Sequence, residues 1–122
     1  MDKIIIKSLK LFAYHGVNPE EKENGQNFIL DIECFLNLDI PCVSDNLYDT
    51  VSYAQIIKTV RKTFLETKYD LIEKAAQMVA DCILENFNQI DEVKVILKKP
   101  EAPIKADFEY VAVAISRKRN KV

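Results

Sequence analysis

The sequence predicts an α+β domain in which a four-stranded antiparallel sheet carries two helices packed on one face. Two alternating apolar segments come first, two segments with helical periodicity follow, and two further alternating segments lie near the end of the chain. This order, ββααββ, differs from the strand–helix alternation of a doubly wound parallel sheet. Because 122 residues provide for one packed core, we expect a single domain over residues 1–122.

The first strand is interrupted in its pattern. Apolar residues occupy even positions through Ile6 and odd positions from Leu9 to Ala13, so the alternation changes phase at Lys7 and Ser8. One extra residue in a strand shifts the phase in this way, and the sequence therefore predicts a β-bulge at this point.

A second, longer strand is expected after a polar loop that Gly16 and Gly25 bracket. Apolar residues alternate with polar ones over this segment, which is typical of a half-buried strand. We expect a turn-rich acidic stretch from Pro41 to Asp49 after it. The residues of its buried face are Phe28, Leu30, Ile32, Cys34, Leu36 and Leu38.

The first helix should begin at about Tyr53. Ser52 and Gln55 have the spacing of a capping box, and Val51 can pack against Ile56 as a hydrophobic staple. Apolar residues then recur at helical spacing.

For the second helix, Asp70 is the expected N-cap, with Glu73 three residues later in a second capping pattern. It should end at about Asn86. Its apolar stripe comprises Ile72, Ala76, Val79, Ile83 and Phe87.

The last two strands are expected around residues 93–97 and 111–115, joined by a loop that contains Pro100 and Pro103. An open four-stranded sheet has two edges, and edges of this length can pair with another copy of the chain. The sequence therefore predicts a homo-oligomer with pockets between its subunits.

The charge and hydropathy of the chain exclude several partners. Nineteen acidic and seventeen basic residues leave a net charge of −2, which does not favour nucleic acid or an anionic membrane. No stretch approaches the roughly 18 apolar residues of a membrane span, and no cleavable signal pattern is present at the N-terminus. We expect a cytoplasmic protein. The one basic cluster is expected to be a solvated tail: Arg117, Lys118, Arg119 and Lys121.

The supply of metal ligands is small. Cys34, Cys42 and Cys82 form no closely spaced pair, and His15 is the only histidine. A thiolate zinc site, a three-histidine metal site or a Ser-His-Asp triad is therefore difficult to build. We expect a metal-free enzyme without a cofactor.

Two charged residues are candidates for chemistry, and each has a structural alternative. Lys99 ends a strand just before Pro100, which favours an extended conformation; such a lysine is either solvated or aimed at a site. Glu73 lies in the first helical turn, where it either completes the cap with Asp70 or accepts two parallel N–H bonds from a ligand.

Other candidates are weaker from position alone. Tyr53 at the start of its helix either packs in the core or donates a proton. Glu20 and Glu21 lie in a polar loop where acidic residues normally face solvent. His15 lies between Tyr14 and Gly16, and its position alone indicates no role.

Four spaced motifs occur in one order along nearly the whole chain. They are Tyr14-His15-Gly16 followed by Glu21 and Gly25-Gln26, then Asp49-Thr50-Val51-Ser52-Tyr53-Ala54, then Leu71-Ile72-Glu73, and finally Lys99-Pro100 with Ala102-Pro103-Ile104. With these motifs the chain resembles the dihydroneopterin aldolase family of folate biosynthesis, which has the tunnelling fold.

The resemblance implies an octamer of two stacked four-subunit rings, with active sites between neighbouring subunits. It implies that Glu73 anchors the amino-pyrimidinone edge of a pterin, and that Val51 and Ile72 shape the pocket. Tyr53 would come from the adjacent subunit, and Lys99 and Glu21 would lie near the glycol side chain of the substrate.

The reaction that the resemblance implies is cleavage of 7,8-dihydroneopterin into 6-hydroxymethyl-7,8-dihydropterin and glycolaldehyde, with epimerisation of a side-chain carbon as a second activity. The ring imine is itself an electron sink, so neither a Schiff base nor zinc is required. Two alternatives stay open at this point: a dihydroneopterin triphosphate epimerase, and a non-catalytic oligomer that binds a pterin.

Overall fold

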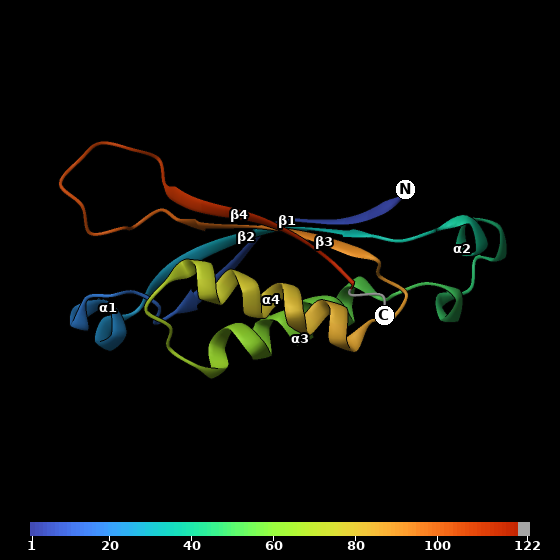
Figure 1. Cartoon of the computed structure of the whole chain (residues 1–122), viewed down its shortest axis with the longest axis horizontal. Coiled ribbons are helices and arrows are strands. Elements are labelled where there is room, and N and C mark those ends of the chain that lie inside the picture. The colour runs from blue at the N-terminus through green and yellow to red at the C-terminus, as the bar shows by residue number, and fades with distance from the viewer. Residues whose placement is uncertain (120–122) are drawn as a thin grey trace.

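The computed structural model describes residues 1–119 and shows a twisted sheet with two long helices against one face (Figure 1). The four strands pair antiparallel in the order β1-β2-β3-β4, which confirms the predicted fold class. The elements are β1 (Lys3–Ala13), α1 (Pro19–Asn24), β2 (Gln26–Phe35), α2 (Asp39–Ser44), the 3-10 helix η1 (Leu47–Asp49), α3 (Tyr53–Glu66), α4 (Ile72–Asn86), β3 (Glu92–Lys99) and β4 (Val111–Lys118).

The predicted bulge in β1 is present. Ile6 pairs with Ile32 and Leu9 with Leu30, so two residues of β1 oppose the single residue Asp31. Ser8 has a positive φ of 57°, and its N–H donates to Asp31 Oδ1 at 2.7 Å. Because of the extra residue, the apolar side chains before the bulge and those after it face the same core.

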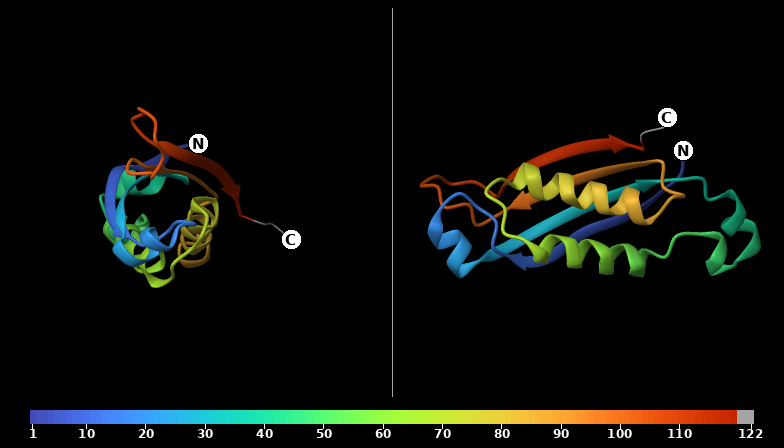
Figure 2. Two further views of the ribbon diagram at one scale, coloured as in Figure 1. Left: turned by 90° about the vertical axis from the view of Figure 1, so that its left-hand side faces the viewer. Right: turned by 60° about the horizontal axis from the view of Figure 1, so that its bottom comes forward.

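The core lies between the sheet and the helix pair α3–α4, as the end-on view of Figure 2 shows. Phe28 of β2 and Phe64 of α3 are buried and meet edge to face, with ring centroids 5.6 Å apart. Replacing a buried Phe by Ala costs about 3–5 kcal/mol, so this pair is a principal contact between the layers. The fully buried residues of α3 and α4 follow the predicted stripes: Ile56, Val60, Phe64, Ala76, Val79 and Ile83.

Two predictions about the connecting segments are wrong. The second strand ends at Phe35, and α2 and η1 replace the expected turns between Pro41 and Asp49. The polar loop between the glycines contains α1. Helices α1 and α2 have six residues each, which is fewer than two turns and too short to show a helical hydrophobic period in the sequence.

The N-cap of α4 also differs from the prediction. Leu71 holds this position, and no side chain caps the helix. Asp70 instead pairs with Lys22 of α1, so a contact between distant segments determines its conformation. The start of α3 agrees with the prediction, since Ser52 Oγ accepts from the Gln55 N–H at 3.4 Å.

The basic cluster at the end of the chain is partly packed. Arg119 donates to the carbonyls of Phe87 and Ile90, and Arg117 donates to Gln77 on α4. Lys121 lies outside the described residues. Over residues 1–119, no helix is both long and apolar enough to cross a membrane.

Candidate active site

A hollow of about 290 Å³ lies at the end of the molecule where α1, the start of α4 and the end of β3 meet. This end is on the left in Figure 1, beside the long connection between β3 and β4. Its lining combines charged side chains with a larger number of apolar ones: Val17, Glu21, Asp70, Leu71, Ile72, Glu73, Lys99, Ala102, Pro103, Ile104 and Val111.

The Glu21 carboxylate is the most buried charge of this hollow. Lys99 Nζ lies 2.5 Å from Glu21 Oε2, and both side chains are largely removed from solvent. Gln26 Nε2 donates to the same oxygen at 2.8 Å, and the Asn18 N–H donates to Oε1 at 3.2 Å. Burial raises the pKa of Glu21, but the hydrogen bonds from Lys99, Gln26 and Asn18 with the lysine charge lower it more. The net pKa lies below the ordinary value, and the carboxylate is ionised at neutral pH.

Gly16 makes the approach to this carboxylate possible. A Cβ at residue 16 would lie 2.4 Å from the carboxyl carbon of Glu21 and 2.5 and 2.6 Å from its oxygens. Its φ of 154° is also uncommon for residues with a side chain. Lys22 donates to the Gly16 carbonyl at 2.7 Å and pairs with Asp70, which connects α1 to the start of α4.

Glu73 lies in the first turn of α4 with its side chain exposed to the hollow. Because Asp70 is not the N-cap, Glu73 does not complete the capping box that the sequence suggested. Within the part of the chain that the structure describes, no ion pair or side-chain hydrogen bond engages its carboxylate. The helix dipole favours a negative charge at this position, so the carboxylate is available to accept two N–H groups.

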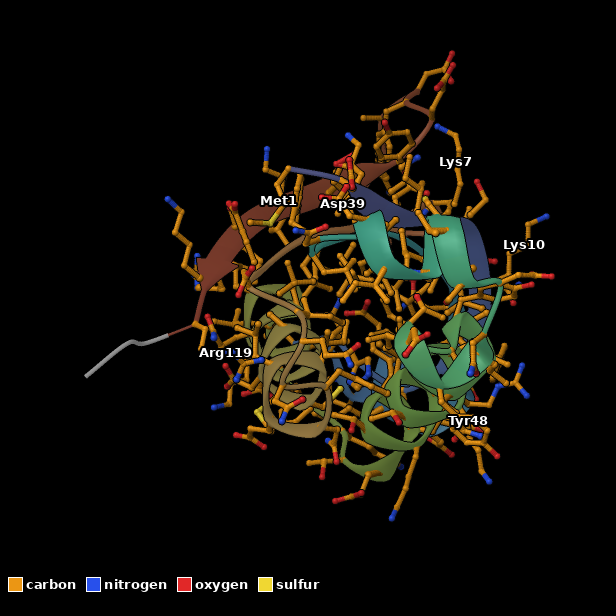
Figure 3. The ribbon with its side chains drawn as sticks, turned by 90° about the vertical axis from the view of Figure 1, so that its right-hand side faces the viewer. Met1, Lys7, Lys10, Asp39, Tyr48 and Arg119 are labelled. Atoms are coloured by element: carbon orange, nitrogen blue, oxygen red, sulfur yellow. The ribbon has the colours of Figure 1, made fainter. Side chains whose placement is uncertain are left out.

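A second hollow, of about 430 Å³, lies at the opposite end of the molecule. Val51 is buried in its wall and Tyr53, at the first position of α3, is exposed. Figure 3 looks at this end and shows α2 and the 3-10 segment with Tyr48 on the outside. The remaining lining is mainly apolar: Ile4, Leu38, Pro41, Leu47 and Ala54.

The structure therefore brings together four of the six predicted site residues, Glu21, Ile72, Glu73 and Lys99, and separates them from Val51 and Tyr53. The 14-residue helix α3 spans about 20 Å between Tyr53 and the turn that leads to α4. The two hollows share no lining residue.

His15 is a core residue. It is fully buried, accepts the Tyr69 N–H at Nδ1 and donates from Nε2 to the Phe64 carbonyl at 2.9 Å. Burial lowers its pKa, the Phe64 bond opposes this, and the charge of Lys99 lowers it further. The neutral imidazole thus joins the segment after β1 to the α3–α4 connection.

Metal ligands do not gather in the described residues, where no cluster of three or more His, Cys, Asp or Glu side chains is arranged for a metal. Cys34 and Cys82 are buried free thiols and Cys42 is exposed. Burial raises the pKa of Cys34 to about 12 and also raises that of Cys82, so neither thiol is an activated nucleophile.

Known proteins are similar to this chain in sequence and in architecture. A family model described as dihydroneopterin aldolase (FolB) matches residues 4–116. Dihydroneopterin aldolase 1 of Arabidopsis thaliana is 40% identical over 120 residues, which cover 98% of this chain and 82% of that protein.

Solved structures of dihydroneopterin aldolases have the same architecture. The structure of Escherichia coli dihydroneopterin aldolase in complex with neopterin has a TM-score of 0.88 and 32% identity, covering 96% of this chain and 99% of that one. A dihydroneopterin aldolase from Burkholderia thailendensis bound to guanine has a TM-score of 0.82 over 98% of this chain and 92% of that one. Its 19% identity shows the fold alone.

Proposed function

The chain belongs to the dihydroneopterin aldolase family, and from this premise we propose how its residues cleave 7,8-dihydroneopterin. It is a carbon–carbon lyase of folate biosynthesis, with 6-hydroxymethyl-7,8-dihydropterin and glycolaldehyde as products. The observation that carries the assignment of roles is the Glu21–Lys99 pair beside the unengaged carboxylate of Glu73.

Glu73 anchors the pterin ring. Its carboxylate accepts two parallel N–H bonds from the amino-pyrimidinone edge, a bidentate arrangement that fixes the ring plane. Ile72 lines the same hollow and covers the apolar surface of the ring.

Lys99 and Glu21 act on the glycol side chain. In its neutral amine form Lys99 takes the proton of the 2′-hydroxyl through a water molecule, and the ammonium that results pairs with Glu21, which also orients the glycol. The C1′–C2′ bond then breaks to form glycolaldehyde, and the electron pair of this bond moves into the N5=C6 imine to give an enamine. Protonation of the enamine at C1′ yields the hydroxymethyl product. Re-addition of glycolaldehyde to the opposite face before release accounts for epimerisation.

Tyr53 of a neighbouring copy helps to deliver the proton to the enamine, and Val51 of that copy forms part of the pocket wall. In the described chain a charged hollow lies at the α1 end and an apolar hollow at the α2 end, so two copies are needed to place all six residues around one substrate. A ring of four subunits, doubled to a cytoplasmic octamer, repeats this junction and pairs the open strand edges.

The first experiment incubates chelator-treated protein with 7,8-dihydroneopterin and separates the pterin products by chromatography, with Lys99→Ala in parallel. We expect hydroxymethyl-dihydropterin from the unmodified protein only. Failure to form it, with epimerisation of the triphosphate substrate instead, would replace the aldolase assignment.

A triphosphate substrate is disfavoured because some of the lysines that could bind it already contact other groups. Lys22 is bound to the Gly16 carbonyl and Asp70, and Lys98 pairs with Asp31 at 2.9 Å. Two of the four lysines that could receive a triphosphate are thus engaged elsewhere; the other two are Lys74 and Lys105.

Subunit complementation tests the shared site. Lys99→Ala and Tyr53→Phe chains are each expected to be nearly inactive, but co-expression should restore about a quarter of the sites, those with an intact Lys99 and an intact Tyr53 from different chains. No gain over the separate variants would mean that both residues serve one chain or that Tyr53 has no role. Light scattering gives the subunit number.

A further inference from the structure

We propose that Gln26 is a positioning residue that holds the Glu21 carboxylate in its catalytic orientation, an inference that rests on the function proposed above for Glu21. Gln26 begins β2, where its backbone pairs with Ala13 of β1. Its side chain is 5% exposed, and Nε2 donates to Glu21 Oε2 at 2.8 Å. Gln26 is therefore fixed by the sheet, whereas Glu21 belongs to the six-residue helix α1.

The orientation of the Gln26 amide follows from its neighbour. A carboxylate only accepts hydrogen bonds, so the NH₂ group must face Glu21, since the flipped amide would place two acceptors in contact. The carbonyl oxygen Oε1 then points into the interior, where it has no hydrogen-bond partner among the described residues.

An unpaired buried amide oxygen destabilises the folded protein, and an apolar side chain of similar size would avoid this cost. An unpaired buried polar group in a native structure requires an explanation, of which a role in catalysis is one. Here the gain is one hydrogen bond to the ionised form of Glu21.

The charges around Glu21 explain why a neutral donor suits this position. Lys99 faces it from β3, His15 lies on the segment after β1, and Asp70 and Glu73 face the same hollow from the start of α4. A second cation in place of Gln26 would compete with Lys99 for the carboxylate. An amide adds a donor without a charge and leaves the Glu21–Lys99 pair intact.

The test compares Gln26→Met, which removes the amide and keeps the length, with Gln77→Met. Gln77 is the control because its Nε2 also donates to a carboxylate, that of Asp81 at 2.8 Å on α4, outside the hollow; its Oε1 accepts from Arg117. Titration of Glu21 is followed by ¹³C NMR in protein labelled at glutamate, with Glu21→Gln for assignment, and the pH profile of kcat/KM is measured for each variant.

In Gln26→Met we expect the Glu21 midpoint to rise by about one pH unit and the acid limb of kcat/KM to move with it. The unfolding temperature should be unchanged or higher, and Gln77→Met should leave both the midpoint and the acid limb in place. Gln26→Glu provides a second, isosteric variant in which two carboxylates share a proton, and it should raise the midpoint further.

An unchanged Glu21 midpoint in both Gln26 variants would overturn the proposal. A shifted midpoint with an unshifted pH profile would overturn its catalytic part, as would the same profile shift in Gln77→Met. The titration requires no turnover, so it separates failure of this proposal from failure of the aldolase assignment.

Discussion

At the end of the molecule that carries α1, three hydrogen-bond donors converge on the buried carboxylate of Glu21, whereas the hollow at the α2 end is lined mainly by apolar side chains. The exposed residues of this apolar end are Ile40, Val43, Leu47, Tyr48 and Tyr53. The charged end is organised within one chain. The exposed side chains of the apolar end fit the subunit interface proposed above, since large exposed apolar patches often mark interaction sites.

The largest expected effect is at the charged end. Lys99→Ala should lower kcat by about 10²–10⁴-fold, the range for loss of a general acid–base group, with a smaller change in pterin affinity. Lys98→Ala is the control, since the neighbouring lysine pairs with Asp31 on the other side of the strand. Steady-state kinetics and fluorescence binding of neopterin measure the two parameters; equal losses in both lysine variants would contradict the role of Lys99.

Glu73→Gln should weaken pterin binding by roughly 10–100-fold, because a charge-assisted bidentate contact becomes a single neutral one. Calorimetric titration with neopterin measures the affinity. Glu20→Gln, on the exposed side of α1, should bind as the unmodified protein does. If Glu73→Gln bound neopterin normally, the anchor would lie elsewhere.

At the apolar end, Val43→Lys should reduce activity about tenfold by weakening assembly, with a stability change within about 0.5 kcal/mol for the fold itself. Val43 is 89% exposed, so the substitution disturbs little within one chain. Light scattering should show smaller species, and Leu65→Lys on α3 should not. Intact assembly and activity in Val43→Lys would show that this end is not an interface.

The smallest expected effect concerns pH and stability. The pKa of His15 is lowered by burial, so the folded state favours the neutral imidazole and the unfolded state binds more protons. This contribution is present above the unfolded pKa of about 6.5 and is lost as pH falls. Glu21 and Asp31 have lowered pKa values and titrate further below this window.

Thermal unfolding between pH 7 and pH 5 should therefore show a fall of a few degrees in Tm. His15→Gln keeps hydrogen-bonding groups without a titration in this range, so its Tm should depend less on pH. Equal slopes in the two proteins would assign the acid sensitivity to other groups.

Sequence periodicity was sufficient where an element was long enough to express it. The bulge at Ser8 and the buried faces of α3 and α4 followed from the phase of apolar residues, and the capping pattern of Ser52 and Gln55 gave the start of α3. For the six-residue helix α1 the sequence marks only the N-terminus, with Asn18 as the cap, Pro19 as the first residue and Glu21 three residues after the cap.

Two site features needed more than a pattern. Asp70 has the residue type and spacing of an N-cap, but in the folded chain it pairs with Lys22 and Leu71 is the N-cap. Gly16 belonged to a recognisable motif, but its close contact with the Glu21 carboxylate is visible only in the folded chain.

The sequence by itself determined the order of the elements, their buried faces and the residue types available for chemistry, because side-chain periodicity reports local backbone geometry. Only the tertiary structure decided that Glu21 meets Lys99, that Gln26 and Asn18 complete its contacts, and that Tyr53 lies at the opposite end. These outcomes depend on contacts between segments far apart in the chain, whereas a local pattern reports only the backbone geometry of its own segment.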